Sequence, residues 1–102
     1  MALFVTQHRH SADTCLARDP KMAPLLLRHL SKANAAKMGI IIHGEAVLDN
    51  HTFLLILDAP NDQRVEQFMS PFAQIGSVDI WPGNSYDTVV ARGSCGSLDN
   101  IT

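Results

Sequence analysis

The sequence predicts a single α+β domain whose elements follow the order strand, helix, strand, strand, helix, strand. Two β-rich apolar runs, residues 39–47 and 51–58, lie on either side of a short polar turn. One segment with apolar residues at helical spacing precedes this pair and another follows it, and each is closed by a glycine, Gly39 or Gly76. With 102 residues, of which 46% are hydrophobic, the chain has material for one core and not for two.

The first strand and the first helix are predicted from residues 2–10 and from the segment that follows Asp19. Residues 2–10 are rich in β-forming residues and change from apolar to polar, as a strand does when it leaves a core. Residues 11–18 show no period and are expected to form a loop. Asp19 can cap a helix and Ser31 can cap a fresh turn within it, so we expect this helix to break at Ser31.

The two apolar runs predict a β-hairpin with a tight turn of positive φ at Asp49 and Asn50. This turn places residue 48 opposite residue 51, and strand alternation then divides the side chains between two faces. The first face is uniformly apolar and is expected to pack under the helices. It holds Ile40, Ile42, Gly44, Ala46, Phe53, Leu55 and Leu57. The second face holds Ile41, His43, Glu45, Val47, Thr52, Leu54, Ile56 and Asp58. This mixture of aliphatic and ionisable residues needs cover, which predicts a homodimer.

The second half of the chain repeats the plan of the first. Residues 60–62 can open a helix, Ser70 and Pro71 are expected to restart a turn, and residues 77–81 are expected to form the last strand. The succession of strand, helix, serine-started turn, glycine and β-rich segment thus occurs twice. Such a split βαβ repeat is the plan of the ferredoxin-like fold with an antiparallel sheet.

The end of the chain is expected to leave the domain. A short helix is predicted to start at Ser85, and the small polar residues from Gly93 onward are expected to form a flexible tail. The domain therefore covers residues 1–92 and the tail covers residues 93–102.

Charge and composition exclude several classes of function. Ten acidic and eight basic residues give a net charge of −2, and no run of Lys or Arg exceeds two residues, so we expect no nucleic-acid partner. The longest apolar run, residues 53–57, is too short to span a membrane, and residues 1–10 do not have the pattern of a secretory signal. Cys15 and Cys95 are far apart and form no disulfide framework, which fits a reducing compartment. We therefore expect a cytoplasmic protein.

Two segments carry a resemblance to a known group of proteins. The order of elements, together with residues 42–46 (Ile-His-Gly-Glu-Ala) and 59–62 (Ala-Pro-Asn-Asp), resembles the dimeric α/β barrel superfamily over residues 2–92. Within it, the chain is similar to small uncharacterised GYD-type and muconolactone-isomerase-like domains. The resemblance implies a homodimeric barrel with a ligand between the sheet and the helices or inside the barrel. It does not select a chemistry, because the superfamily includes cofactor-independent monooxygenases, haem-degrading enzymes, lactone isomerases, dehydratases and amino-acid-sensing modules.

His8 and His10 are two residues apart on the first predicted strand, so their side chains project to the same face. This spacing allows both imidazoles to bind one metal ion. The ordinary alternative is a polar strand end that solvates two imidazoles. Asp58, at the end of the third predicted strand, is expected to approach the pair and to orient it.

His43 shares the mixed hairpin face with Glu45, whose carboxylate can tune an imidazole as a general base or complete a metal site. The alternative for this pair is an ordinary contact between two subunits. Gly44, which lies between them, indicates the close approach of another group. His51, next to the turn, is expected to face solvent.

Three further residues are candidates for a site. Cys15 follows the histidine pair and is a possible third metal ligand or nucleophile, although a loop thiol without a neighbouring lysine is more often inert. Trp81 and Tyr86 flank a Pro-Gly pair and are candidates for the wall of a ligand pocket. A tryptophan at the end of a strand is as often an ordinary core residue.

These residues leave three classes of function open. The leading hypothesis is a homodimer that binds a small organic molecule, as a cofactor-independent isomerase or monooxygenase with His8, His10 and His43 as acid–base groups. The second is a non-catalytic module that binds a transition metal through His8 and His10, completed by His43, Cys15 or Asp58. The third is a structural or regulatory dimer whose pocket is filled by its own side chains.

Overall fold

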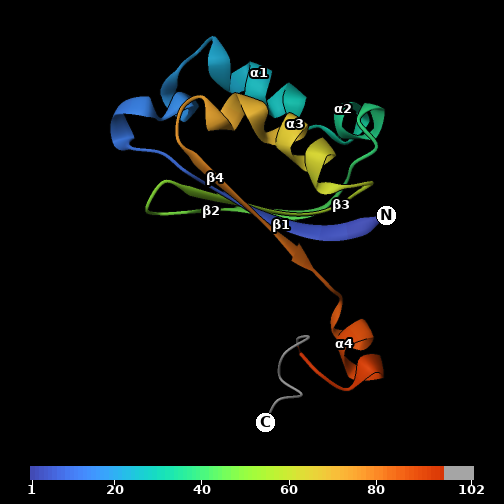
Figure 1. The fold of residues 1–102 in the computed structure, drawn as a ribbon. Helices are drawn as coiled ribbons and strands as arrows, with labels where there is room; N and C mark the ends of the chain where they lie inside the picture. The colour runs from blue at the N-terminus through green and yellow to red at the C-terminus, as the bar shows by residue number, and fades with distance from the viewer. Residues whose placement is uncertain (96–102) are drawn as a thin grey trace.

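A computed structural model of the chain describes residues 1–95. Four strands, β1 (Ala2–Arg9), β2 (Ile41–Leu48), β3 (Thr52–Ala59) and β4 (Ser77–Gly83), form one sheet in the order β2-β3-β1-β4. All neighbouring strands are antiparallel. Three helices lie together over one face of this sheet, and among residues 1–95 no helix covers most of the other face (Figure 1). The predicted α+β class with an antiparallel sheet is confirmed.

The first two helices, α1 (Met22–His29) and α2 (Lys32–Lys37), are separated where the sequence predicts a break. Ser31 Oγ accepts a hydrogen bond from the backbone N–H of Asn34 and so caps α2. Asp19 Oδ1 accepts the backbone N–H groups of Lys21 and Met22 just before α1. The stretch predicted to be a loop contains two short 3₁₀ turns, η1 (Ala12–Thr14) and η2 (Leu16–Arg18).

The third helix, α3 (Asp62–Ala73), begins as predicted, because Asn61 Oδ1 accepts the backbone N–H of Arg64 at 2.9 Å. The predicted restart at Ser70 and Pro71 is wrong, since α3 runs through both residues. Pro71 has no N–H to donate to the carbonyl of Gln67, and Ser70 Oγ donates to that carbonyl at 2.8 Å instead. The serine therefore keeps the helix continuous at the proline.

The core lies between this sheet face and the helices. Phe68 and Met69 of α3 are buried against Leu55 and Leu57 of β3. Two polar side chains of β1, Thr6 and His8, are buried on the same side. Both polar side chains have hydrogen-bond partners in the core. The hydroxyl of Thr6 donates to Met69 Sδ at 3.8 Å, and both ring nitrogens of His8 form hydrogen bonds, as described below.

The hairpin is formed as predicted, but its register is not. The turn contains three residues, 49–51, so that Leu48 pairs with Thr52. Positive φ occurs at His51, at +59°, and not at Asp49 or Asn50. A β-bulge then shifts the register again between Ile42 and Gly44.

The new register moves the middle of β2 to different faces. Gly44 and Ala46 pair with residues of the open face, Ile56 and Leu54, and not with the buried ones. Glu45 and Val47 pair with Leu55 and Phe53, so they share the helix side of the sheet, where the edge strand leaves them exposed. The predicted faces are therefore wrong for residues 44–47, because a shift of one residue exchanges the two faces.

The last helix, α4 (Tyr86–Arg92), is also formed as predicted and starts after Ser85. It lies beyond the end of β4, away from the three helices that cover the sheet (Figure 1). Gly93, which follows Arg92 and caps the C-terminal end of the helix, adopts a φ of +79°. Most of the predicted tail, residues 96–102, lies outside the described residues. No helix within the described part of the chain is both long and apolar enough to cross a membrane.

Candidate functional site

Three metal-binding side chains meet at one end of the sheet. One ligand atom from each of His10, Cys15 and His51 lies within 4.8 Å of the other two, and all three residues are partly buried. His10 follows β1, Cys15 lies between the two 3₁₀ turns, and His51 ends the hairpin turn. The backbone N–H of His10 donates to the carbonyl of His51 at 3.3 Å, which fastens the strand end to the turn. Segments far apart in the sequence are thereby held together.

A chain of hydrogen bonds determines which nitrogen of His10 is available. His8 Nδ1 lies 3.1 Å from the carbonyl oxygen of Ser77, and a carbonyl can only accept, so Nδ1 of His8 carries the proton. Nε2 of neutral His8 then accepts from His10 Nδ1, at 3.1 Å. Nδ1 of His10 must be the protonated nitrogen, and Nε2 of His10 is left with a bare lone pair. A lone pair in this state is what metal coordination by imidazole requires.

The bare nitrogen is also buried without a partner. His10 Nε2 is one of two buried side-chain polar atoms with no hydrogen bond among the described residues, and the other is Thr52 Oγ1, directly after His51. A buried nitrogen without a partner is unfavourable by about 1–3 kcal/mol. An ion bound between His10, Cys15 and His51 would remove this cost.

Burial keeps the two strand histidines neutral. Desolvation lowers the pKa of His8 below its ordinary value of 6.5, with a smaller contribution from the nearby His10, while the bond to Ser77 acts in the opposite direction. Desolvation also lowers the pKa of His10, and electrostatic repulsion between His10 and His51 adds to this lowering. The rings of His8 and His10 are stacked with centroids 5.0 Å apart. The predicted pairing of these two histidines is thus present, in the neutral form that binds metals.

Gly76 allows β4 to approach this cluster. A Cβ on Gly76 would lie 2.0 Å from the carbonyl oxygen of Arg9 and 3.0 Å from Cε1 of His8. Any larger residue would therefore push the start of β4, and with it the Ser77 carbonyl, away from His8.

His51 was expected to face solvent, and this prediction is wrong. Its ring lies edge-on to that of His10, with centroids 5.1 Å apart. The residue is the third ligand that the sequence does not reveal, since its position depends on the pairing of β1 with β3 and on the length of the turn. Of the two strand histidines that Cys15 was expected to join, it lies beside His10, and His8 is not part of the cluster.

The structure does not bring His43 or Asp58 to His8 and His10. Asp58 pairs with Leu3 on β1, and Leu3 lies five residues before His8. Asp58 and His8 are therefore about 17 Å apart along the strand direction. His8 also lies on the helix side, while Asp58 shares the open face with Ile41. The predicted single pocket of three histidines, and the predicted role of Asp58 beside the strand pair, are therefore not formed.

His43 and Asp58 instead form a second pair. His43 Nε2 lies 2.9 Å from Asp58 Oδ2, and the two side chains are 46% and 28% exposed. Glu45, the expected partner of His43, lies on the other side of the sheet because of the bulge. A Cβ on Gly44 would meet nothing within 4 Å, so the close approach expected there is absent among the described residues.

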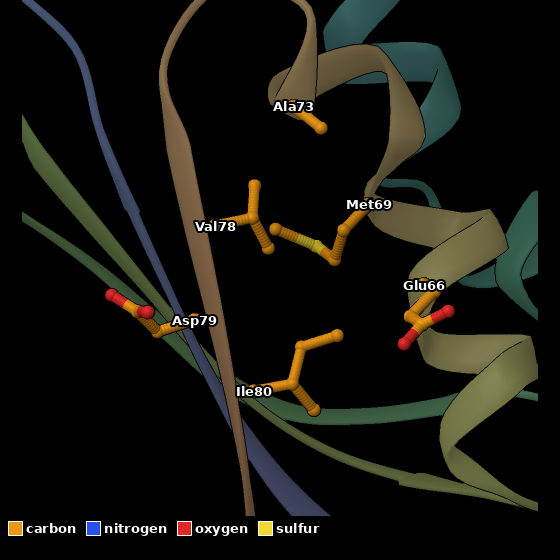
Figure 2. Close-up of a pocket in the computed structure, with 6 residues that line it drawn as sticks. All are labelled: Glu66, Met69, Ala73, Val78, Asp79 and Ile80. Carbon is orange, nitrogen blue, oxygen red and sulfur yellow. The ribbon is translucent and has the colours of Figure 1, made fainter.

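Neither of the two cavities described for residues 1–95 contains the metal-binding cluster. One, of about 380 Å³, lies between α3 and β4. Figure 2 shows Met69, Val78 and Ile80 pointing into it, Glu66 at its rim and Asp79 on the far side of the strand. It is therefore a mainly apolar groove with one carboxylate, that of Glu66, at its rim. The second, of about 490 Å³, is lined by His43 and Asp58. Trp81 and Tyr86 line neither of these two cavities and are 47% and 81% exposed.

Comparison with protein-family models, with curated proteins and with solved structures finds no match to the chain. Function must therefore be argued from the side chains themselves.

Proposed function

We propose that the protein binds one thiophilic transition-metal ion of the Zn²⁺ class through His10 Nε2, Cys15 Sγ and a ring nitrogen of His51. The observation that carries the proposal is the buried, unpartnered Nε2 of His10. The hydrogen bonds from His10 to His8 and from His8 to the Ser77 carbonyl leave this nitrogen unprotonated. His8 is then not a ligand but a positioning residue, which holds the ring of His10 as second partners of metal-binding histidines do.

The donor set matches this class of ion. Thiolate selects Zn²⁺ and Cu⁺ over Mg²⁺ and Ca²⁺, and imidazole suits the same ions. In a tetrahedral zinc site the ligand atoms lie about 3.5 Å apart. The ligand atoms of His10, Cys15 and His51 are within 4.8 Å of one another, so shifts of about 1 Å would close the site. Three protein ligands leave a fourth position for water or another ligand, as in zinc sites that exchange or activate a ligand.

Titration of the reduced protein with Co²⁺ as a spectroscopic substitute for Zn²⁺ tests the proposal. We expect one ion per chain, an absorption band from a bond between thiolate and cobalt, and displacement of Co²⁺ by Zn²⁺. Cys15→Ser should remove the thiolate band and His10→Ala should abolish stoichiometric binding. Cys95→Ser is the matched control, because Cys95 is exposed and lies outside the cluster. Binding below one ion per chain in the wild type, or binding unchanged in both site variants, would contradict the proposal.

We also infer that the domain is a ferredoxin-like protomer that pairs with a second copy through its open sheet face. The order β2-β3-β1-β4 with antiparallel neighbours supports the first part of this inference. Four large apolar side chains on that face are each about half exposed, which supports the second part. They are Ile41, Leu48, Ile56 and Trp81. A second copy would cover them by presenting the same face, as twofold interfaces do.

A further inference from the structure

The second cavity lies at the opposite end of the sheet from the metal-binding cluster. This space of about 490 Å³ is lined by the start of β1 (Met1, Ala2 and Leu3), the His43–Asp58 pair, and four residues at the junction of β4 with α4 (Gly83, Asn84, Ser85 and Thr88). Ligand sites of proteins commonly have volumes of about 300–1,000 Å³ and combine apolar walls with a few polar groups. The cavity is therefore large enough for a small organic molecule.

The β-bulge is what presents His43 to this cavity. The register shift lies between Ile42 and Gly44, so His43 is the extra residue of β2. Bulges re-aim a side chain and interrupt strand pairing, and they are frequent beside functional sites. Here the ring of His43 reaches across to the carboxylate of Asp58 on the neighbouring strand β3.

The bond to Asp58 leaves one ring nitrogen of His43 free. A carboxylate accepts, so Nε2–H of His43 donates to Asp58 Oδ2 at 2.9 Å. In the neutral ring Nδ1 is then a bare lone pair, and no hydrogen bond of Nδ1 to another described residue occurs. A carboxylate in this position orients the ring and stabilises the imidazolium that forms when Nδ1 takes a proton.

Ser85 lines the same cavity, but it is not placed as a nucleophile for this pair. Its Oγ donates to Asp87 Oδ1 at 2.5 Å, and Thr88 Oγ1 lies 2.8 Å from Ser85 Oγ. The proton of Ser85 is therefore directed to Asp87 and not to His43, which argues against acyl transfer. Ser85, Thr88 and the amide of Asn84 provide hydrogen-bonding groups for a ligand that is itself hydroxylated.

We propose that His43 and Asp58 form a general-base site for a small neutral hydroxy-carbonyl compound held between the start of β1 and the β4–α4 junction. Met1, which carries the α-amino group, and the carboxylate of Asp58 both line the cavity, while no described lysine or arginine does. One basic and one acidic group balance each other, so a neutral ligand is favoured over an anion. His43 Nδ1 takes the proton from the carbon between the hydroxyl and the carbonyl. The C–H bond breaks, its electron pair forms the C=C bond of an enediolate, and the former carbonyl oxygen takes the negative charge. The proton returns to the same carbon, or to the former carbonyl carbon while the hydroxyl proton passes to the charged oxygen. No oxidant, reductant or cofactor is consumed.

The exchange of carbon-bound hydrogen of hydroxyacetone in D₂O, followed by NMR with a metal chelator present, tests the proposal. We expect the wild-type protein to accelerate exchange and His43→Gln to lose about 100-fold or more of that acceleration, as removal of a general base does. Asp58→Asn should lose part of it. Glu45→Gln is the matched control, since Glu45 is on the same strand but on the other side of the sheet.

Two results would overturn the inference: exchange in the wild type no faster than with the same concentration of free imidazole, or an undiminished rate in a folded His43→Gln. Should that variant not fold, titration of the wild-type protein with hydroxyacetone decides instead. A shift of the His43 ring resonances that saturates supports the site, and its absence contradicts it. The chelator makes the outcome independent of the metal-binding proposal.

Discussion

The backbone conformation at residue 51 favours glycine, whereas the candidate metal site there requires histidine. A φ of +59° is disfavoured for residues other than glycine by about 1–2 kcal/mol, whereas metal binding needs an imidazole. His51→Gly should therefore weaken Zn²⁺ binding by at least about tenfold. The free energy of unfolding of the metal-free protein should change by less than about 1 kcal/mol, because relief at this φ offsets the entropy of glycine. Calorimetric Zn²⁺ titration and urea unfolding with chelator measure the two effects.

His51→Asn provides the control for this position, since asparagine also tolerates positive φ but has no imidazole. It should behave as His51→Gly does. Undiminished Zn²⁺ affinity in both variants would remove His51 from the site, and strong destabilisation without metal would show that the ring has a packing role instead.

The two neutral strand histidines predict a specific pH dependence of stability. Their pKa values are lowered in the folded protein, chiefly by burial, so below pH 6.5 the unfolded chain binds more protons than the folded one. This contribution to the free energy of unfolding is fully present above pH 6.5 and is lost as the pH falls through the folded pKa values. Urea midpoints of the metal-free protein should therefore fall between neutral and mildly acidic pH.

His8→Phe separates this effect from general acid denaturation. The variant removes one of the two shifted groups, so its urea midpoint should depend less on pH in the same interval. It also leaves Ser77 and His10 without their partner, which should cost about 1–3 kcal/mol at neutral pH. An equally steep pH dependence in wild type and variant would contradict the assigned role of His8.

At the level of elements, the sequence predicts best where the determining chemistry is local. The caps at Ser31 and Asn61 act within a few residues of themselves, and both helix starts are found where these residues predict them. The interruption expected at Pro71 is absent because Ser70 supplies the missing hydrogen bond, a compensation that spacing alone does not reveal.

The hairpin shows why the remaining features could not be predicted. Asp-Asn-His is compatible with a turn of two or of three residues, and the choice exchanges the faces of the strand that precedes it. The bulge at His43 then restores the predicted face for Ile41 and Ile42 but not for residues 44–47. The pairing of β2 with β3 therefore places Glu45 on the other side of the sheet from His43 and makes Asp58 the partner of His43.

The candidate metal site also has one part that depends on local sequence and another that depends on strand pairing. Cys15 follows His10 by five residues, so their proximity could be predicted from the chain itself. The approach of His51 requires β3 to pair with β1, and the tautomer of His10 requires the carbonyl of Ser77 from β4. Three separate strands therefore complete a site of which the sequence shows only the first part.

At the scale of the whole molecule, the corrected register predicts how the protein assembles. Ile56 points to the open sheet face and is 45% exposed, while Val47 on the adjacent strand is 71% exposed but shares the helix side with Phe53. If two copies pair through the open face, a charge at residue 56 is buried in the interface and a charge at residue 47 is not. We expect the wild type and Val47→Glu to sediment as dimers and Ile56→Glu as a monomer at the same concentration. Dissociation by Val47→Glu, with Ile56→Glu still dimeric, would place the interface on the helix side. A monomeric wild type would instead leave the open face without a second copy, and the four half-exposed apolar side chains on it would need a different partner.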